Sequence, residues 1–459
     1  MRKLSYPRCM PCFGLSQPTP LFAATALAII FFAGASSASA QTTKQAARAY
    51  IDLATYSSDM PGMGMFTGAG GGGQPAGGLG GALGGMFGGA VGGATGSGNT
   101  FGTTHAGGFG AAGKFMDVSV HAPKNPSLDE AAQAIPGGMK LGASLKLVSP
   151  ASGKPIQHDD DQPIEPQYEK PKGKISIYWG CGETVRPGQP RTLDMAKVSM
   201  DEYAKFFVAR SSTTRGARSQ PGHPSWPNKP DDRRVPDSAS LVGEHAFSGS
   251  GIPENFKVTL GAAQDLMPPI ELNQKKSGDG GVMLEWKTIP HARGYFISVM
   301  GGKSGRGSEE MIFWTSSELP DTGFGLVNYQ TNSSIDKWLK EKVILPPSTT
   351  KCAVPKGIFG DKDGGMLNMI AYGHEAFFAF PPRPADAKKP WDPVWQAKVR
   401  VKSTLASMLG GMEQRGSRQE DGGRDYTSQP RDSAKKRGGD TVPGVEDAVK
   451  DVLKNIFKF

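Results

Sequence analysis

Two stretches of the sequence contain part of a motif for phosphate binding or nucleophilic catalysis, and each lacks a residue that the chemistry requires. The stretch GGKS at residues 301–304 has the end of a phosphate-binding loop, but that motif begins with a glycine where this chain has Ile297. The stretch FSGSG at residues 247–251 has part of a nucleophile elbow around Ser250, which would need a glycine at Ser248. We therefore interpret the first stretch as a hairpin turn and assign no nucleophile to the second.

Candidate metal ligands are also incomplete. The stretch DKDGG at residues 361–365 begins like a calcium loop, but Tyr372 stands where an EF-hand needs its glutamate. His158 precedes Asp159–Asp161, a run that we interpret as a solvated acidic stretch. The sequence thus assigns no catalytic, cofactor-binding or metal-ligating residue, and we expect no cofactor. A catalytic triad could still form from distant residues, because triads are defined by their geometry.

The first 40 residues have the pattern of a secretory signal peptide. Three basic residues precede an apolar run of 12 residues at 21–32, which is shorter than the roughly 20 residues that span a bilayer as a helix. The small residues Ala38, Ser39 and Ala40 follow, the pattern that signal peptidase cleaves. We expect cleavage between Ala40 and Gln41, with an uncleaved anchor as the alternative.

The mature chain would have a modest positive charge and two cysteines. The full sequence has a formal net charge of +9, and removal of the three basic residues leaves +6. Basic and acidic residues are interspersed, so we expect no nucleic-acid partner. Cys9 and Cys12 lie in the leader, which leaves Cys181 and Cys352. An oxidising compartment permits these two to pair, and we predict a disulfide between them.

The elements that would position any site are mainly β-strands. From about residue 115, apolar residues recur at every second position, the period of a strand with one buried face. We predict a mainly β fold with two sandwich-like units, residues 115–210 and 241–410, separated by an exposed loop at residues 211–240. The clearest strand is at 395–402, where one face is predicted to point inward and the other outward: Trp395, Ala397, Val399 and Val401 against Gln396, Lys398, Arg400 and Lys402.

A few short helices are expected beside these strands. Within residues 41–61, apolar residues from Ala47 to Ala54 recur at helical spacing and predict a short amphipathic helix. Ser199 and Glu202 form a capping box before an aromatic stripe. A second stripe of this kind is expected to begin at Ser333.

Residues 281–301 resemble a known family of β-sandwiches. They contain a strand with the pattern Leu-x-Trp, a short turn with Pro and Gly, and a strand that opens on Tyr. This order resembles the second and third strands of fibronectin type III and related immunoglobulin-like domains. The resemblance implies that Trp286 and Tyr295 pack in the core between two sheets, and it implies no activity. Trp395 is a third core candidate.

Residues 62–114 form a glycine-rich segment, with 24 glycines in 53 residues. Within it, residues 77–96 repeat glycine pairs every four residues, a spacing similar to the glycine-zipper segments of bacterial envelope proteins. In water, each glycine inside a helix costs about 1 kcal/mol relative to alanine, which favours a disordered tether. In lipid, the same spacing permits close contact between helices, so a membrane-seeking or self-associating zipper is the alternative.

The C-terminal segments are expected to differ from each other. Residues 411–442 mix both charges with Gly and Ser and are predicted to be disordered. Residues 443–459 place apolar residues at helical spacing, with acidic residues at the start and lysines at the end. A helix this short needs a partner surface. We expect it to dock on a membrane or a partner, with the chain's own core as the alternative.

These features together favour an exported protein of the periplasm, the outer envelope or the medium. The whole chain resembles exported proteins of Gram-negative bacteria, which implies an address and no activity. We expect a non-enzymatic cell-envelope protein that binds another envelope component or assembles with itself, and residues 443–459 or 77–96 are its candidate contacts with a membrane surface. The alternatives are a secreted hydrolase with a site of scattered residues and a membrane-inserting glycine-zipper protein.

Overall fold

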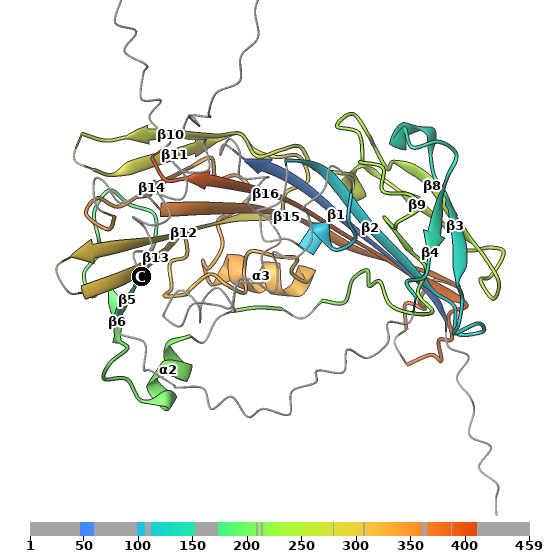
Figure 1. The fold of residues 1–459 in the computed structure, drawn as a ribbon, viewed down its shortest axis with the longest axis horizontal. Coiled ribbons are helices and arrows are strands. Elements are labelled where there is room, and N and C mark those ends of the chain that lie inside the picture. The colour runs from blue at the N-terminus through green and yellow to red at the C-terminus, as the bar shows by residue number, and fades with distance from the viewer. Residues whose placement is uncertain are drawn as a thin grey trace, which may run out of the picture. The chain divides into compact units, whose positions relative to one another are not determined.

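The prediction of a mainly β fold with few helices is confirmed. The computed structural model describes residues 46–58, 99–105, 112–151, 173–207, 210–212, 214–278, 280–305, 308–359, 365–386 and 388–410. Among these residues, thirteen strands form one sheet in the order β6-β5-β13-β12-β15-β16-β1-β2-β7-β4-β3-β8-β9, and three form a second in the order β10-β11-β14 (Figure 1).

The strands are β1 (Ala47–Ser58), β2 (Gly113–His121), β3 (Glu130–Ala134), β4 (Ser144–Val148), β5 (Lys174–Trp179), β6 (Arg191–Asp194), β7 (Ser225–Trp226), β8 (Gly243–Ser248), β9 (Lys257–Leu260), β10 (Leu272–Lys276), β11 (Val282–Trp286), β12 (Gly294–Gly305), β13 (Ser308–Thr315), β14 (Lys351–Val354), β15 (Gly365–Phe380) and β16 (Trp395–Met408). The helices are α2 (Met200–Phe206) and α3 (Asn332–Lys340), with short 3-10 turns η2 (Thr103–His105), η3 (Gly137–Met139) and η4 (Ala262–Gln264). The capping box of Ser199 and Glu202 is confirmed at α2, whereas α3 begins earlier than expected, with Thr331 as its N-cap.

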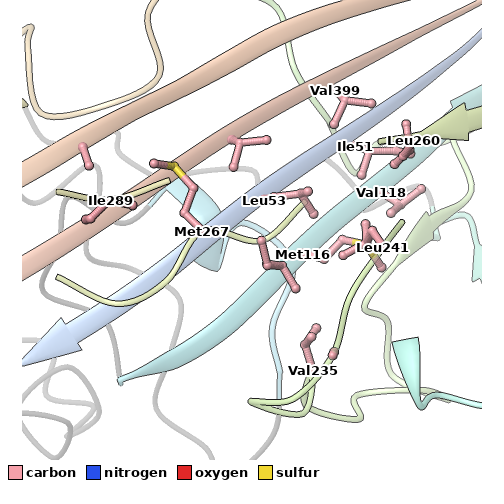
Figure 2. Close-up of a cluster of buried hydrophobic side chains, with 14 of the residues drawn as sticks. Ile51, Leu53, Met116, Val118, Val235, Leu241, Leu260, Met267, Ile289 and Val399 are labelled. Atoms are coloured by element: carbon pink, nitrogen blue, oxygen red, sulfur yellow. The ribbon is translucent and has the colours of Figure 1, made fainter. Parts of the chain in front are cut away.

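The four strands β2, β1, β16 and β15 are neighbours in the large sheet, and their two faces have different environments. On one face, alternate apolar residues form the main hydrophobic core, which includes Ile51, Met116 and Val399 (Figure 2). The three-stranded sheet packs on this side, because β11 and β14 contribute to the same core. Helix α3 packs on the opposite face, where Ile335 and Trp338 contact Phe296 of β12 and its neighbours.

Trp286 and Tyr295 lie in the core, in different sheets. Trp286 is in β11 of the small sheet and Tyr295 is in β12 of the large sheet, and the two ring centroids are 5.7 Å apart. The two strands do not pair with each other, because β11 lies between β10 and β14 while β12 lies between β13 and β15. The burial of Trp286 and Tyr295 agrees with the core role expected of them, and the resemblance to fibronectin type III stays a prediction.

The helix predicted within residues 41–61 is wrong, because residues Ala47–Ser58 form strand β1. This segment pairs along its length with β16 on one side and with β2 on the other. Its small apolar residues fit a helical spacing and a strand spacing equally well. Hydrogen bonding to two neighbouring strands decides between them, since tertiary context overrides weak local preference.

The two predicted units do not separate at residues 211–240. Strand β5 from the first unit pairs with β13 from the second, so both units contribute to the same large sheet. The segment 211–240 is also not simply an exposed loop. It contains β7, which lies between β2 and β4, and Trp226 in this strand is fully buried. The composition rich in Pro and Ser correctly indicated that most of this segment is irregular. It did not indicate that the segment contributes a strand to the sheet.

Part of the glycine-rich segment is ordered, which corrects the expectation of a tether across all of 62–114. Residues 99–105 include η2, and β2 begins at Gly113. Residues 62–98 and 106–111 lie outside the described residues, as do the leader, the expected cleavage site at Ala40 and Gln41, the charged tail 411–442 and the expected helix 443–459.

Cys181 and Cys352 are joined by a disulfide bond. Cys181 follows β5 of the large sheet, and Cys352 lies in β14 of the small sheet. The backbone N–H of Gly182 also donates a hydrogen bond of 2.9 Å to the carbonyl of Ala353. The disulfide therefore links the two sheets across the core.

Candidate functional site

Four charged residues lie opposite one another across four neighbouring strands. Asp117 of β2 is opposite Asp52 of β1, Asp52 is opposite Arg400 of β16, and Arg400 is opposite Glu375 of β15. We call this set the charge row. A β-bulge between Tyr372 and Glu375 places Glu375, and not the preceding histidine, opposite Arg400. The charge row lies on the face of the sheet away from the main hydrophobic core.

The prediction that Arg400 and Lys402 face solvent is wrong, since they are only 3% and 1% exposed. Segments from elsewhere in the chain cover this face. Tyr329, from the connection between β13 and α3, lies over both cations, with its ring centroid 4.3 Å from the Arg400 guanidinium carbon and 4.7 Å from the Lys402 ammonium nitrogen. Gly216 crosses so close to the row that a Cβ there would lie 1.6 Å from Arg400 Nη2.

Asp52 is the best-connected carboxylate of the row. It accepts hydrogen bonds from Arg400 Nε at 2.7 Å and from the backbone N–H of Ala217 at 2.9 Å, and it pairs with His105 Nε2 at 3.1 Å. Burial alone would raise the pKa of Asp52, but the charge of Arg400 and the contact with His105 outweigh burial and lower that pKa well below its usual range. Asp52 is therefore a buried anion at neutral pH.

Asp117 and Lys402 are less well compensated. Burial raises the pKa of Asp117 to about 6, although Thr104 and the N–H of Gly102 donate hydrogen bonds to its carboxylate. Burial and the neighbouring Arg400 lower the pKa of Lys402 to about 7. The Lys402 ammonium donates a hydrogen bond of 3.0 Å to Asn328. Both groups therefore titrate near neutral pH.

The space beside the charge row is too small for a substrate. A cavity of about 10 Å³ is lined by residues that include Tyr329, Glu375, Arg400 and Lys402. That volume is close to the roughly 10–15 Å³ that one water molecule requires. The charge row is therefore a structural polar core, and any ligand larger than water must bind elsewhere.

A groove of about 850 Å³ opens at the end of the sheet where β1 and β16 begin and β15 ends. This is within the range of roughly 300–1,000 Å³ that is typical of ligand sites. Strand β9 and the connection between β15 and β16 complete its walls. Tyr50, Lys398 and Phe377 are opposite one another in the sheet, two residues along the strands from the charge row and on the same face. The lining also includes Ala397 and Trp395 of the core face, so the groove lies around the end of the strands.

The groove is lined by five cationic side chains, Arg48, Arg215, Lys257, Arg383 and Lys398, and by no carboxylate among the described residues. Lys257 pairs with Glu244 and Lys398 pairs with Glu375, both of which lie outside the lining. Arg48 and Arg215 have no carboxylate within ion-pair distance in the part of the chain that the structure describes. The local field of the groove is positive, which favours an anionic ligand.

Aromatic side chains alternate with these cations. The lining includes Tyr50, Phe377, Phe378, Trp391 and Trp395. Arg383 lies 5.6 Å from the ring centroid of Trp391, and the Lys398 ammonium lies 4.9 Å from that of Phe377. Cation–π contacts of this kind hold the cations over apolar surface. The groove can thus contact a negative charge and an apolar group of the same ligand.

Lys398 connects the groove to the charge row. Its ammonium pairs with the carboxylate of Glu375 and donates a hydrogen bond of 2.7 Å to Thr214 Oγ1. The carbonyl of Thr214 accepts a hydrogen bond of 3.1 Å from Arg400 Nη1. One wall of the groove is therefore held in place by the buried network.

The residues singled out in the sequence contribute little to this site. Trp395 lines the groove and stacks on Phe256 with ring centroids 4.8 Å apart, whereas Trp286 and Tyr295 lie in the core. Residues 301–304 belong to strand β12, and 361–364 lie outside the described residues. Sequence analysis missed Asp52 and Asp117. For Asp117 the available signal was a charge at an alternating position of a predicted strand, whereas Asp52 lay in a segment that was predicted to be a helix.

Comparison with protein-family models and with curated proteins finds no match for this chain. Within the described residues, no group of three His, Cys, Asp or Glu side chains could hold a metal ion. None of the helices in the same residues has both the length and the apolarity to cross a membrane.

Proposed function

We propose that this chain is an exported, non-enzymatic protein of the cell envelope that binds an anionic envelope component in the groove. The observation that carries the proposal is the lining of the groove, with five cations, five aromatic rings and no carboxylate among the described residues. A concave site lined by aromatic rings and by arginines without a carboxylate partner among the described residues is typical of ligand recognition.

Export rests on the pattern of residues 1–40 and is compatible with the Cys181–Cys352 disulfide. An envelope protein meets acidic glycans, anionic lipids and acidic protein segments. Arg48 and Arg215, which pair with no carboxylate of the described residues, suit the carboxylate or phosphate groups that these ligands share, because a guanidinium binds either group through two parallel hydrogen bonds.

The test compares the wild-type chain with the double variant Arg48→Gln, Arg215→Gln. Each is incubated with an acidic polysaccharide, with anionic lipid vesicles and with an acidic peptide, at low and at high salt. We expect the wild-type chain to bind at least one of these ligands, more weakly at high salt, and the variant to lose most of that binding. Unchanged binding by the variant would show that the groove is not the site.

The matched control is Lys351→Gln, since Lys351 is an exposed cation in β14 of the small sheet, away from the groove. Its binding should equal that of the wild-type chain. Circular dichroism and thermal unfolding are measured for all three proteins. Equal spectra and melting temperatures would show that a loss of binding is not caused by a loss of folding.

A further inference from the structure

Exposed apolar side chains occur at the end of the sheet where the groove opens. The described surface leaves five large apolar side chains exposed, and three of them are Phe377, Phe380 and Val394, which are 68%, 45% and 44% exposed. Phe377 lines the groove, Phe380 ends β15, and Val394 donates its backbone N–H to the carbonyl of Phe380 at 2.7 Å. We call these three residues the apolar rim. Phe377 shares a face of the sheet with Lys398, whereas Phe380 stacks on Trp395 on the other face, so the apolar rim surrounds the ends of the strands with side chains from both faces. Exposed apolar side chains at such an end are a candidate interaction surface.

The apolar rim is next to the cations of the groove. The Lys398 ammonium lies over the ring of Phe377. Arg383 and Trp391, which form a second cation–π contact, belong to the connection between β15 and β16, and Val394 is the last residue of that connection. Two carboxylates of this connection, Asp386 and Asp392, do not line the groove. Exposed aromatic and aliphatic side chains surrounded by Arg and Lys are the composition of surfaces that enter the interface of an anionic membrane.

The lining favours a lipid over an acidic glycan. Sugar hydroxyls need hydrogen-bond acceptors as well as donors, and proteins supply the acceptors mainly from Asp, Glu, Asn and Gln. The uncharged polar side chains of the lining are Tyr50, Thr259 and Gln396, and the remainder is cationic, aromatic or aliphatic. A phosphate headgroup needs only donors, which the arginines provide, and acyl chains need only apolar surface, which the rim provides.

We propose that the apolar rim enters the surface of an anionic lipid membrane while the groove binds phospholipid headgroups. This inference rests on the proposed function of the groove as an anion site and names its ligand. The surface is distinct from residues 77–96 and 443–459, the membrane contacts that the sequence suggested.

The experiment measures co-sedimentation of the full chain with two kinds of vesicle, one of phosphatidylcholine and one of phosphatidylcholine and phosphatidylglycerol in equal parts. We expect binding to the anionic vesicles only. The variant Phe377→Ser, Val394→Ser should reduce the partition coefficient by about tenfold or more, because it removes apolar surface from the interface. The control Leu319→Ser changes an exposed leucine that belongs neither to the apolar rim nor to the lining of the groove, and it should leave binding unchanged.

Charge is tested separately from apolar contact. Each basic residue near an anionic surface raises the partition coefficient about fivefold. The double variant Arg48→Gln, Arg215→Gln should therefore reduce the partition coefficient by more than tenfold, whereas the control Lys351→Gln should leave it unchanged. The same variants are made in a chain that ends at residue 442, so that any binding by residues 443–459 does not hide the effect. Inorganic phosphate is added as a competitor, to separate a headgroup site from a site for the free ion.

The outcomes distinguish this inference from the proposed function. Binding of an acidic polysaccharide through Arg48 and Arg215, with no binding to vesicles, would overturn the lipid inference and leave the anion site standing. Vesicle binding that the rim variant does not weaken would also overturn the lipid inference. The same holds for vesicle binding that millimolar phosphate abolishes while the rim variant binds normally. Failure to bind any anion would overturn both.

Discussion

At the scale of single residues, the unusual feature is a buried ion pair between Asp52 and Arg400, surrounded by further titratable groups. Removing two ions from water costs several kcal/mol for each, and mutual attraction offsets that cost only when the hydrogen bonding is nearly complete. Asp52 satisfies this condition with contacts from Arg400, His105 and the N–H of Ala217. Removal of either member would therefore leave the other as an uncompensated buried charge.

The variant Asp52→Asn tests this dependence. It keeps the shape of the side chain but leaves the Arg400 guanidinium buried without its counter-ion, so we expect a loss of about 3–5 kcal/mol in the free energy of unfolding. Urea unfolding followed by tryptophan fluorescence measures it. The control Glu244→Gln removes a half-exposed partner of Lys257 and should cost less than about 1 kcal/mol. Equal effects of the two variants would contradict the interpretation.

Lys402 gives a prediction for pH. The folded-state pKa is lowered to about 7, whereas an unfolded lysine titrates near 10.5, so the unfolded chain binds more protons between those values. The free energy of unfolding should therefore rise with pH from about 7 to about 10, and Lys402→Met should reduce that rise. The control Lys229→Met changes an exposed lysine and should keep the wild-type pH dependence. Parallel profiles for all three proteins would show that Lys402 does not titrate in this range.

At the scale of elements, the segment around Gly216 lies across the charge row and covers it. A Cβ at Gly216 would lie 1.6 Å from Arg400 Nη2 and 2.4 Å from Asp52 Oδ2, so only a glycine fits at this position without a shift of the ion pair. We expect Gly216→Ala to reduce the free energy of unfolding by at least about 2 kcal/mol, because the ion pair must shift.

Gly137→Ala is the matched control for this change. A Cβ at Gly137 meets nothing within 4 Å, so its effect should be within about 0.5 kcal/mol. Thermal unfolding of both variants in one buffer gives the comparison. A Gly216→Ala protein as stable as the control would mean that the segment is not held against the row.

The disulfide joins two elements that belong to different sheets. Its cysteines are 171 residues apart in sequence, and a cross-link of this span constrains the unfolded chain strongly in the chain-entropy model. We expect Cys181→Ala, Cys352→Ala to lower the free energy of unfolding by about 2–5 kcal/mol. Mass spectrometry of a non-reduced digest should show the two peptides linked. Two alkylatable thiols in freshly purified wild-type protein would contradict the bond.

At the scale of the whole molecule, the large sheet places its polar residues in two environments. The middle of the polar face is closed by the connection that carries Tyr329 and by the segment around Gly216, while the end of the sheet opens into the groove. Rigid walls are an advantage for a binding site, because less order must be acquired when the ligand binds. The buried network around Arg400 thus supports the proposed function without contacting the ligand.

Export is the prediction that belongs to the whole chain. Protein recovered from the cell envelope should begin at or near Gln41, which N-terminal sequencing measures, because the pattern before Ala40 is the one that signal peptidase cleaves. The variant Ala38→Asp, Ala40→Asp should accumulate with the leader attached. Mature wild-type protein that still begins at Met1 would contradict cleavage.

Several local features of this protein could be predicted from short stretches of its sequence. The alternation from Trp395 to Val401 identified one buried face of β16, and Ser199 with Glu202 identified the start of α2. Without residues 1–40, the predicted leader, counting leaves Cys181 and Cys352 as the one remaining pair of cysteines. These inferences succeed because a strand's period and a helix cap depend on residues only a few positions apart.

The candidate site, in contrast, depends on packing between segments that are distant in the sequence. Arg400 and Lys402 follow a solvent-facing pattern, and they are buried because Tyr329 and Gly216, each more than 70 positions away, cover them. The groove likewise combines β1, β9, β15 and β16 with Arg215. A charge at an alternating position satisfies the period of a strand whether water or another segment covers it. Long-range packing alone decides between these two environments, and with them whether a cation supports the fold or binds a ligand.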